Sequence, residues 1–546
     1  MPPNVAPLDL RDFLCVAPAV VLAFWGLVVV GLDLGRFRRL ETEARRLACG
    51  RATLVGVGLA LGSALALAWI DATAQTDAPR LVALFGDSLG EYLARTDGLV
   101  FFGTVARGLA VDALNVVFLG LLAMVVWMST AYRFTDDQGE YYALMLWATV
   151  GMMLMAAAEE LATLFVALET TTLCLYLATA FERSRRRSPE AGLKFFVYGS
   201  VSSALFLYGL SLVYGLTGTT YFDAIGRALR DGGEGLAGNL AGVAALLLML
   251  AGFGFKVSAA PFHQWAPDAY EGAPAPVAAW IASGSKVAGF VAMLKVFAHA
   301  LGPWSHPSAS VMGPGWLGVV AVVATASMTY GNFAALVQTD YKRMLAYSSI
   351  AHAGYLLVGV AAASVSADGA ASAGAMLYYL IVYALANVGA FAAAVWLARD
   401  KGTEAIADLN GLAGRSPLLA LAIAVLMLSL VGVPPFAGFF GKLYVFMEAL
   451  RQGPSDARIV LTWLVAVGLF NSVVSAFYYF RVMKAMYLRE PSDPPLRPAR
   501  SAIALPIAAT AALVTVLGVA SEPLVDVCRS IAVPMLTASP LESPTD

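Results

Sequence analysis

Long apolar runs recur from one end of the sequence to the other, and they constrain its fold more than any other feature. A run of about eighteen or more predominantly apolar residues lets one helix cross a bilayer. Only 13% of the residues are charged, against about 25% in a typical soluble domain. The ten-residue alternating segments of an outer-membrane barrel are missing. The sequence therefore predicts an all-α polytopic membrane protein.

Hydropathy predicts about fourteen transmembrane helices. They fall near 13–33, 53–71, 112–132, 141–158, 161–180, 194–215, 238–262, 274–300, 316–336, 344–363, 373–397, 417–449, 458–483 and 501–521. The joints are short except at 72–111 and 216–237, each of which has room for an amphipathic helix. Residues 222–232, FDAIGRALRDG, have the pattern of such a helix lying at the surface.

The distribution of lysine and arginine predicts the orientation. With the N-terminus outside, 22 basic residues fall in inward joints and 9 in outward segments, while the remaining 4 of the 35 lie within spans. Inward joints of membrane proteins carry such an excess of positive charge. We therefore expect an even number of spans, with both termini on the outer side.

Two lysines in residues 252–290 stand where a bilayer makes charge expensive. Lys256 lies in the seventh span between glycines and Pro261, and Lys286 lies near the middle of the eighth. A charge at the bilayer centre costs about 2.5–3.5 kcal/mol, so intramembrane lysines are functional candidates by default. Proline also removes a backbone donor, which predicts a broken helix with unpaired carbonyls beside Lys256. The alternative for Lys256 is a lysine that snorkels to the interface.

A third lysine stands in a second interrupted span. Lys442 follows Pro434 and Pro435 in the sequence LVGVPPFAGFFGKLYVF. Two broken helices, five spans apart, suggest two inverted five-helix repeats of the kind that transporters use. We accordingly divide the chain into helices 1–3 with a long outer loop, two antiporter-like repeats, and a final helix with a tail. These units are residues 1–135, 136–303 (helices 4–8), 304–485 (helices 9–13) and 486–546.

Glu169 is the clear carboxylate at mid-depth and the natural partner for a lysine. A buried lysine loses affinity for its proton, and a nearby carboxylate restores that affinity. A Glu–Lys pair that opens and closes would therefore act as a proton switch. The alternative is a static pair that holds two helices together.

Other polar residues allow two interpretations each. His352 in the tenth span is either a satisfied core histidine or a bridge from Lys286 towards Lys442. Lys295 is better explained by snorkelling, and Glu159 and Glu160 by surface charge. The remaining groups are Asp112, a relay member or an N-cap, and His263, Asp268 and Glu271, a structural cap or a proton entry.

Cofactor and nucleic-acid chemistry find no support in the sequence. The four cysteines are far apart, without a CxxC pair, and no two histidines have metal-ligand spacing. Neither GxxxxGK[ST] nor a GxGxxG opening a βαβ unit occurs. A net charge of −2 argues against nucleic-acid binding. We expect no cofactor and no metal in this chain.

Four stretches resemble a known family: LFVALETTTLCLYLATAFERSRRRSPEAGLKFFVYGSVSSALFLYG, FKVSAAPFHQWAPDAYEGAPAPVAAWIASGSK, YKRMLAYSSIAHAGYLLVG and GVPPFAGFFGKLYVF. They are similar to the subunit N family of bacterial proton-pumping NADH:quinone oxidoreductase, respiratory complex I. The resemblance spans most of residues 98–485. The sequence departs from the family in a longer 72–97 segment, in Glu159–Glu160 and in the threonines after Glu169.

The resemblance implies a function. The chain would be a proton-translocating, non-redox subunit of the membrane arm in the bacterial inner membrane, with both termini periplasmic. Its neighbours would be antiporter-like subunit M and small subunit K, while NADH, flavin, iron–sulfur clusters and quinone would belong to partner subunits. By match of motif, the relay residues would be Glu169, Lys256, Lys286 and Lys442, and His352 would be a possible further member. Lys194 matches a family lysine at the start of the sixth span.

Two other functions remain open at the level of sequence. The large subunits of Mrp-type cation/proton antiporters share the broken helices, so the chain could belong to an antiporter without a redox partner. A helix bundle could also act as a passive coupling scaffold that transmits conformational change and carries no protons.

Overall fold

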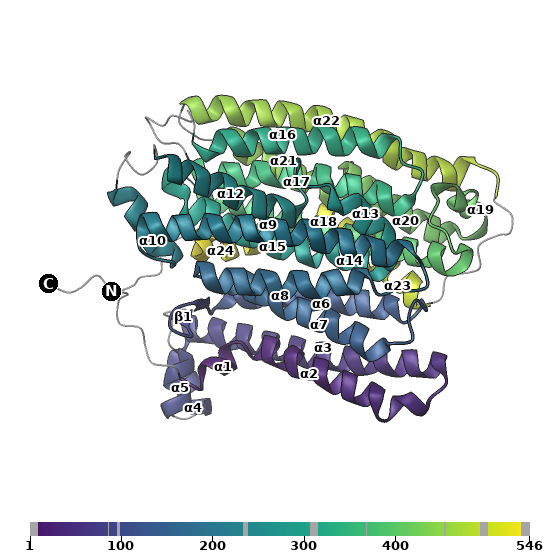
Figure 1. Ribbon diagram of the computed structural model, residues 1–546, viewed down its shortest axis with the longest axis horizontal. Coiled ribbons are helices and arrows are strands. Elements are labelled where there is room, and N and C mark those ends of the chain that lie inside the picture. Colours follow the sequence, from purple (N-terminus) through teal and green to yellow (C-terminus); the bar gives the residue numbers. More distant parts are fainter. Residues whose placement is uncertain are drawn as a thin grey trace.

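A computed structural model shows long helices that run side by side in one bundle (Figure 1). It describes residues 9–85, 87–94, 99–232, 239–305, 315–366, 368–451, 455–491 and 501–536. Within these residues, 13 helices are long and apolar enough to cross a membrane, and α20 is a shorter apolar helix. The all-helical membrane fold is thereby confirmed.

The first half of the chain contains α1–α15, β1 and β2. They are α1 Asp12–Cys15, α2 Ala17–Leu34, η1 Phe37–Arg39, α3 Thr42–Thr76, α4 Ala78–Phe85, α5 Asp87–Ala94, β1 Leu99–Val100, β2 Val105–Ala106, α6 Leu109–Ser129, α7 Gln138–Ala157, α8 Leu161–Thr179, α9 Arg187–Thr217, α10 Phe222–Asp231, α12 Leu240–Val257, α13 Trp265–Gly272, α14 Ala275–Ala282 and α15 Gly284–Leu294.

The second half begins with two short helical turns and ends with α24. Its elements are η2 Lys295–Ala300, η3 Gly302–Trp304, α16 Trp316–Leu336, α17 Tyr341–Val365, α18 Gly369–Lys401, η4 Ile406–Leu409, α19 Leu412–Arg415, α20 Pro417–Val431, α21 Ala437–Arg451, α22 Ser455–Leu488, α23 Ser501–Val519 and α24 Glu522–Leu536. α17 and α18 occupy the centre of the bundle, where nearly all their side chains are buried.

The joint at 72–111 is more ordered than a long loop. α3 extends to Thr76, and α4, α5 and the hairpin of β1 and β2 follow it. These short elements lie beside the ends of α1 and α3, in the purple part of Figure 1. The amphipathic helix expected at 222–232 is also present, as α10.

Both predicted helix breaks occur, and the two have the same backbone form. α12 ends at Val257 with Ser258 in the left-handed region (φ 61°), and α20 ends at Val431 with Gly432 there (φ 89°). The amide that follows each of these residues bonds a carbonyl five residues back, as in a Schellman cap. Cis peptide bonds precede Pro261 and Pro435. The predicted twelfth span is thus two half-helices, α20 and α21.

Two helix pairs repeat the same close contact. A Cβ added to Gly151 of α7 would lie 2.8 Å from the Ala167 carbonyl of α8, and one added to Gly331 of α16 would lie 2.8 Å from the Tyr347 carbonyl of α17. α7 and α16 are the fourth and ninth spans in chain order. An odd number of crossings separates them, so the two pairs cross the membrane in opposite directions.

Candidate functional site

Lys256 lies in the last turn of α12, beside the first break. It is 4% exposed, and its Nζ has no hydrogen-bond partner among the described residues. Two carbonyls of the turn that precedes the break have partners. The Ala259 amide bonds the Gly254 carbonyl at 2.7 Å, and Trp265 Nε1 bonds the Phe255 carbonyl at 3.1 Å. The ammonium group therefore has no fixed acceptor.

Lys286 lies in the first turn of α15, between the two breaks in the chain, and is 1% exposed. Its Nζ donates to the Ser349 carbonyl of α17 at 2.5 Å and lies 5.8 Å from the centre of the Tyr383 ring. Gly289, on the same helix, leaves room for the side chain of Lys256, because a Cβ there would lie 3.2 Å from Lys256 Cγ. The aliphatic part of the Lys256 side chain therefore packs against α15, the helix that carries Lys286.

His352 lies on α17 between the other two lysines, and it is 2% exposed. Its Nδ1 is 2.6 Å from the Tyr379 hydroxyl, and its Nε2 is 3.3 Å from the Tyr479 hydroxyl. Ser349, which accepts the bond from Lys286, and Tyr355, whose ring lies beside Lys442, stand three residues before and after it on α17. The structure thus places the histidine where the bridging interpretation needs it.

Lys442 reaches back across the second break from α21. It is 5% exposed, and its Nζ donates to the carbonyls of Val431 and Leu430 at 2.8 and 3.3 Å. These carbonyls lie in the last turn of α20, where a cation is favourable. The same Nζ is 4.7 Å from the centre of the Tyr355 ring. Lys442 is therefore bonded to the C-terminal carbonyls of a half-helix. The Nζ of Lys256 makes no such bond among the described residues.

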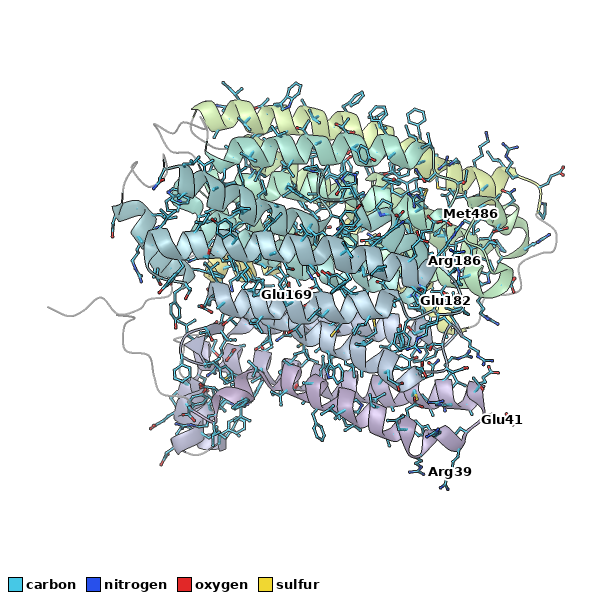
Figure 2. All side chains as sticks on the ribbon, viewed as in Figure 1. Arg39, Glu41, Glu169, Glu182, Arg186 and Met486 are labelled. Atoms are coloured by element: carbon cyan, nitrogen blue, oxygen red, sulfur yellow. The ribbon has the colours of Figure 1, made fainter. Side chains whose placement is uncertain are left out.

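Glu169 stands apart from this line, on the half-buried face of α8 (Figure 2). Its carboxylate accepts a short hydrogen bond from Ser203 of α9. It interacts electrostatically with Lys256, although no hydrogen bond joins the two groups among the described residues. A narrow crevice lined by Thr172, Ser202 and Ser203 lies beside Lys256. The structure shows this predicted pair in an open arrangement.

Asp268 and Glu271 form an ion cluster on α13, just after the first break. Arg343 of α17 bonds Asp268 at 2.8 Å and Glu271 at 2.7 Å, while Lys194 bonds Asp268 and Arg187 bonds Glu271. Burial alone would raise the pKa of Asp268, but the bonds from Lys194 and Arg343 outweigh it and hold the pKa below its usual range. A polar pocket of about 210 Å³ opens beside the cluster. Lys194, Asp268 and Glu271 of the cluster line this pocket.

A second ion cluster joins the two halves of the chain at the same, arginine-rich end, which holds Arg183 and Arg185–Arg187. Glu404 accepts two bonds from Arg185 at 3.0 and 3.1 Å and pairs with Lys342 at 3.0 Å. Burial raises the pKa of Glu404, yet Lys342 and Arg185 outweigh it and lower the pKa below the usual range. Figure 2 labels Glu182 and Arg186 at this end.

Lys295 and Glu159 depart from the expectations of snorkelling and surface charge. Lys295 is buried in η2 and pairs with Glu159 Oε1 at 2.8 Å. Glu160 is buried and caps α8 through the Thr163 amide at 2.7 Å. All these groups lie at the end of the bundle opposite the arginine-rich end. Lys295 therefore links η2 to the turn between α7 and α8.

Sequence reasoning missed the tyrosines that surround His352. The hydroxyls of Tyr379 and Tyr479 bond it directly, and the ring of Tyr383 packs against it. Their sequence signal is weak, because tyrosines in apolar helices commonly pack as core. The spacing of Tyr379 and Tyr383, four residues apart on one helix face, was the available hint. Within the described residues, no cluster of three or more metal-ligating side chains occurs.

Comparison with known proteins points to one family. Residues 158–475 match the family described as NADH:quinone oxidoreductase/Mrp antiporter, TM. A Rhodospirillum rubrum protein named NADH-quinone oxidoreductase subunit N is 38% identical over 525 residues, covering 96% of this chain and 97% of that protein. A Sorangium cellulosum protein named NADH-quinone oxidoreductase subunit N 1 is 40% identical over 520 residues, covering 93% and 96%.

Solved structures show the same fold. A chain of respiratory complex I from Thermus thermophilus with bound aureothin is 32% identical, with a TM-score of 0.71 over 93% of this chain and 98% of that one. A chain of the Mrp complex from a Dietzia species has a TM-score of 0.75 over 97% and 98%, at 21% identity. The second likeness shows a shared fold alone.

Proposed function

The chain belongs to the NADH:quinone oxidoreductase/Mrp antiporter family, and from this premise we propose that it is subunit N, a proton-translocating membrane subunit of NADH:quinone oxidoreductase. Relatives with that printed name match it over nearly its whole length. The observation that carries the proposal is the line of buried groups along α17, where Lys286 bonds Ser349, His352 bonds Tyr379 and Lys442 lies beside Tyr355. The Mrp likeness is one of fold and favours no separate antiport function.

The centre of this line, His352 with its two tyrosine partners, has the groups that proton transfer requires. A tyrosine hydroxyl both donates and accepts, and neutral histidine does the same through its two nitrogens. His352 with Tyr379 and Tyr479 therefore forms a relay that can accept a proton at one ring nitrogen and release one at the other. Lysines at both ends of this relay supply and receive the proton.

Lys256 and Glu169 form the gate to this line. Within the described part of the chain Lys256 has no hydrogen-bond acceptor, so its charged form depends on the carboxylate of Glu169. Closing the pair stabilises the ammonium, and opening it favours release of the proton towards Lys286. Lys194 and the polar pocket beside Asp268 give the entry at the arginine-rich end.

The remaining features of the proposal follow from the family and from charge. The chain holds no redox centre, and NADH, flavin, iron–sulfur clusters and quinone belong to partner subunits. Subunits M and K are its neighbours in the membrane arm of a bacterial inner membrane. The positive-inside rule places the arginine-rich end in the cytoplasm and both termini in the periplasm. The four-unit division of the chain accords with the repeated α7–α8 and α16–α17 contacts.

Substitution of the terminal lysines tests the proposal. Lys256→Ala and Lys442→Ala, each in the assembled complex, should lower proton pumping coupled to NADH oxidation at least about tenfold, since positioned proton-transfer groups contribute 10²–10⁴-fold. Lys484→Ala is the control, because Lys484 is exposed on α22. Proton uptake by inverted vesicles provides the readout. Full pumping in both variants would refute the relay and favour a passive scaffold.

A further inference from the structure

Two buried aspartates lie close together at the end of the bundle opposite the arginine-rich end. Asp71 lies near the end of α3 and is 6% exposed, and Asp112 lies in the first turn of α6 and is 3% exposed. The two carboxyl groups interact electrostatically. The Oδ2 atom of each is buried and has no hydrogen-bond partner among the described residues. Two acids therefore share one buried place between packed helices.

One cation serves both acids. Arg107, in the joint between β2 and α6, bonds Asp71 Oδ1 at 3.0 Å and the carbonyls of Leu93 and Tyr92 at 2.6 and 3.3 Å. The charged groups that act on Asp112 are Asp71 and Arg107. The other titratable groups around the arginine are Asp12 and Cys15 of α1 and Tyr92 of α5.

Asp33 shows what a buried carboxylate looks like when it is ionised. It is fully buried on α2, and Arg45 bonds both of its oxygens, at 2.5 and 2.7 Å. The Gly139 amide and the Cys49 thiol donate to it as well. Each oxygen thus has two donors. Asp112 has no donor of this kind within the described residues, and Asn115, one turn further along the same face of α6, also has a buried oxygen without a partner.

We propose that Asp71 and Asp112 form an acid pair that binds one proton between them, a proton-binding site separate from the lysine line. Two carboxylates in contact cannot both ionise out of water, because their repulsion and desolvation exceed what one guanidinium returns. A shared proton turns one oxygen into a donor, so the contact becomes a hydrogen bond. The proton comes from the aqueous phase at the end of the bundle that holds α4, α5 and the hairpin.

Carbodiimide labelling of the assembled complex tests this site. Dicyclohexylcarbodiimide reacts with a protonated carboxyl group: the acid proton goes to a reagent nitrogen, the carboxylate oxygen bonds the central carbon, and the adduct rearranges to a stable N-acylurea. Mass spectrometry of peptides should find label on Asp71 or Asp112, decreasing as the pH rises, and none on Asp33. Label on Asp33 at the level of the pair would overturn the proposal.

A stability comparison decides the matter where the reagent labels neither site. Asparagine resembles a protonated aspartic acid, so Asp112→Asn should leave the thermal midpoint of the complex within about a degree of the parent. Asp33→Asn should lower it by several degrees, because Arg45 then lacks its partner. Equal loss in the two variants would show that Asp112 is an ionised carboxylate and would refute the acid pair.

Discussion

Two lysines of the proposed relay also bond backbone carbonyls. Lys442 satisfies two carbonyls that the end of α20 leaves without intrahelical partners, so its charge is compensated without a carboxylate. Lys286 likewise rests on the Ser349 carbonyl. The Nζ of Lys256 bonds no carbonyl in the part of the chain that the structure describes. The three lysines therefore differ in the number of carbonyls that they bond. Lys256, which bonds none among the described residues, is the one on which the charge of Glu169 acts.

Two adjacent tyrosines on α18 allow a matched test of the relay. The Tyr379 hydroxyl bonds His352, whereas the Tyr378 hydroxyl bonds the Leu517 carbonyl of α23. Tyr379→Phe should lower proton pumping about two- to tenfold, the equivalent of one hydrogen bond worth 0.5–1.5 kcal/mol. Tyr378→Phe should leave it unchanged. Pumping rates of inverted vesicles, normalised to assembled complex, give the measurement, and equal effects would exclude a role for the Tyr379 hydroxyl.

The lysines could be predicted because they are charged residues in apolar runs. The tyrosines around His352 could not, because they carry no charge. Lys256, Lys286 and Lys442 are visible because an ionisable group within an apolar run has few structural explanations. Tyr379 and Tyr479 are hydroxyl groups on otherwise apolar side chains, and only the packing of α17, α18 and α22 shows which way they point. Lys295 was misjudged for a similar reason, because its partner Glu159 is remote in sequence.

At the scale of elements, proline and glycine predicted where both helix breaks occur. They did not predict the hydrogen bonds that the backbone makes there. The runs around Pro261 and around Pro434–Pro435 predicted interruptions, and α12 and α20 end there. The sequence could not show that the Schellman cap bonds the Gly254 carbonyl and that Trp265 bonds the Phe255 carbonyl, because those bonds depend on three-dimensional placement. In the 72–111 joint the sequence predicted room for one amphipathic helix, and it did not separate α4 from α5, because helices of eight residues are too short to resemble spans.

The glycine contacts of the two repeats give a prediction about helix packing. Gly151→Ala and Gly331→Ala would each place a methyl group within 3 Å of backbone atoms on the next helix. Each should destabilise the protein by about 1–3 kcal/mol, the usual cost of overpacking. Gly120→Ala in α6 is the control, because its Cβ would meet nothing within 4 Å. Thermal unfolding in detergent measures the difference; a neutral Gly331→Ala would argue against the close approach.

Across the whole molecule, ion clusters at the arginine-rich end connect the two repeats. Arg185 follows α8, whereas Glu404 follows α18 and Lys342 opens α17. Arg343 makes a second connection to α13 through Asp268 and Glu271. Since each repeat carries part of the proposed relay, these contacts hold the two parts of the proposed relay against each other. The fold of each half was predictable, but this connection between distant segments was not.

Glu404 makes the connection depend on pH. Its pKa is held below the ordinary value of about 4.3, so its contribution to stability is complete above that pH and is lost as the pH falls through the folded-state pKa. Glu404→Gln should therefore cost about 3–5 kcal/mol at pH 7, because it leaves the buried Lys342 without its carboxylate partner and removes the two bonds of the half-buried Arg185. The difference from the parent should shrink as the pH falls below about 4. Asp136→Asn, which removes only an exposed pair with Arg133, should cost at most about 1 kcal/mol at either pH. Thermal midpoints of the purified complex across this pH range supply the data, and a loss that stays constant on acidification would mean that Glu404 is not ionised in the folded protein.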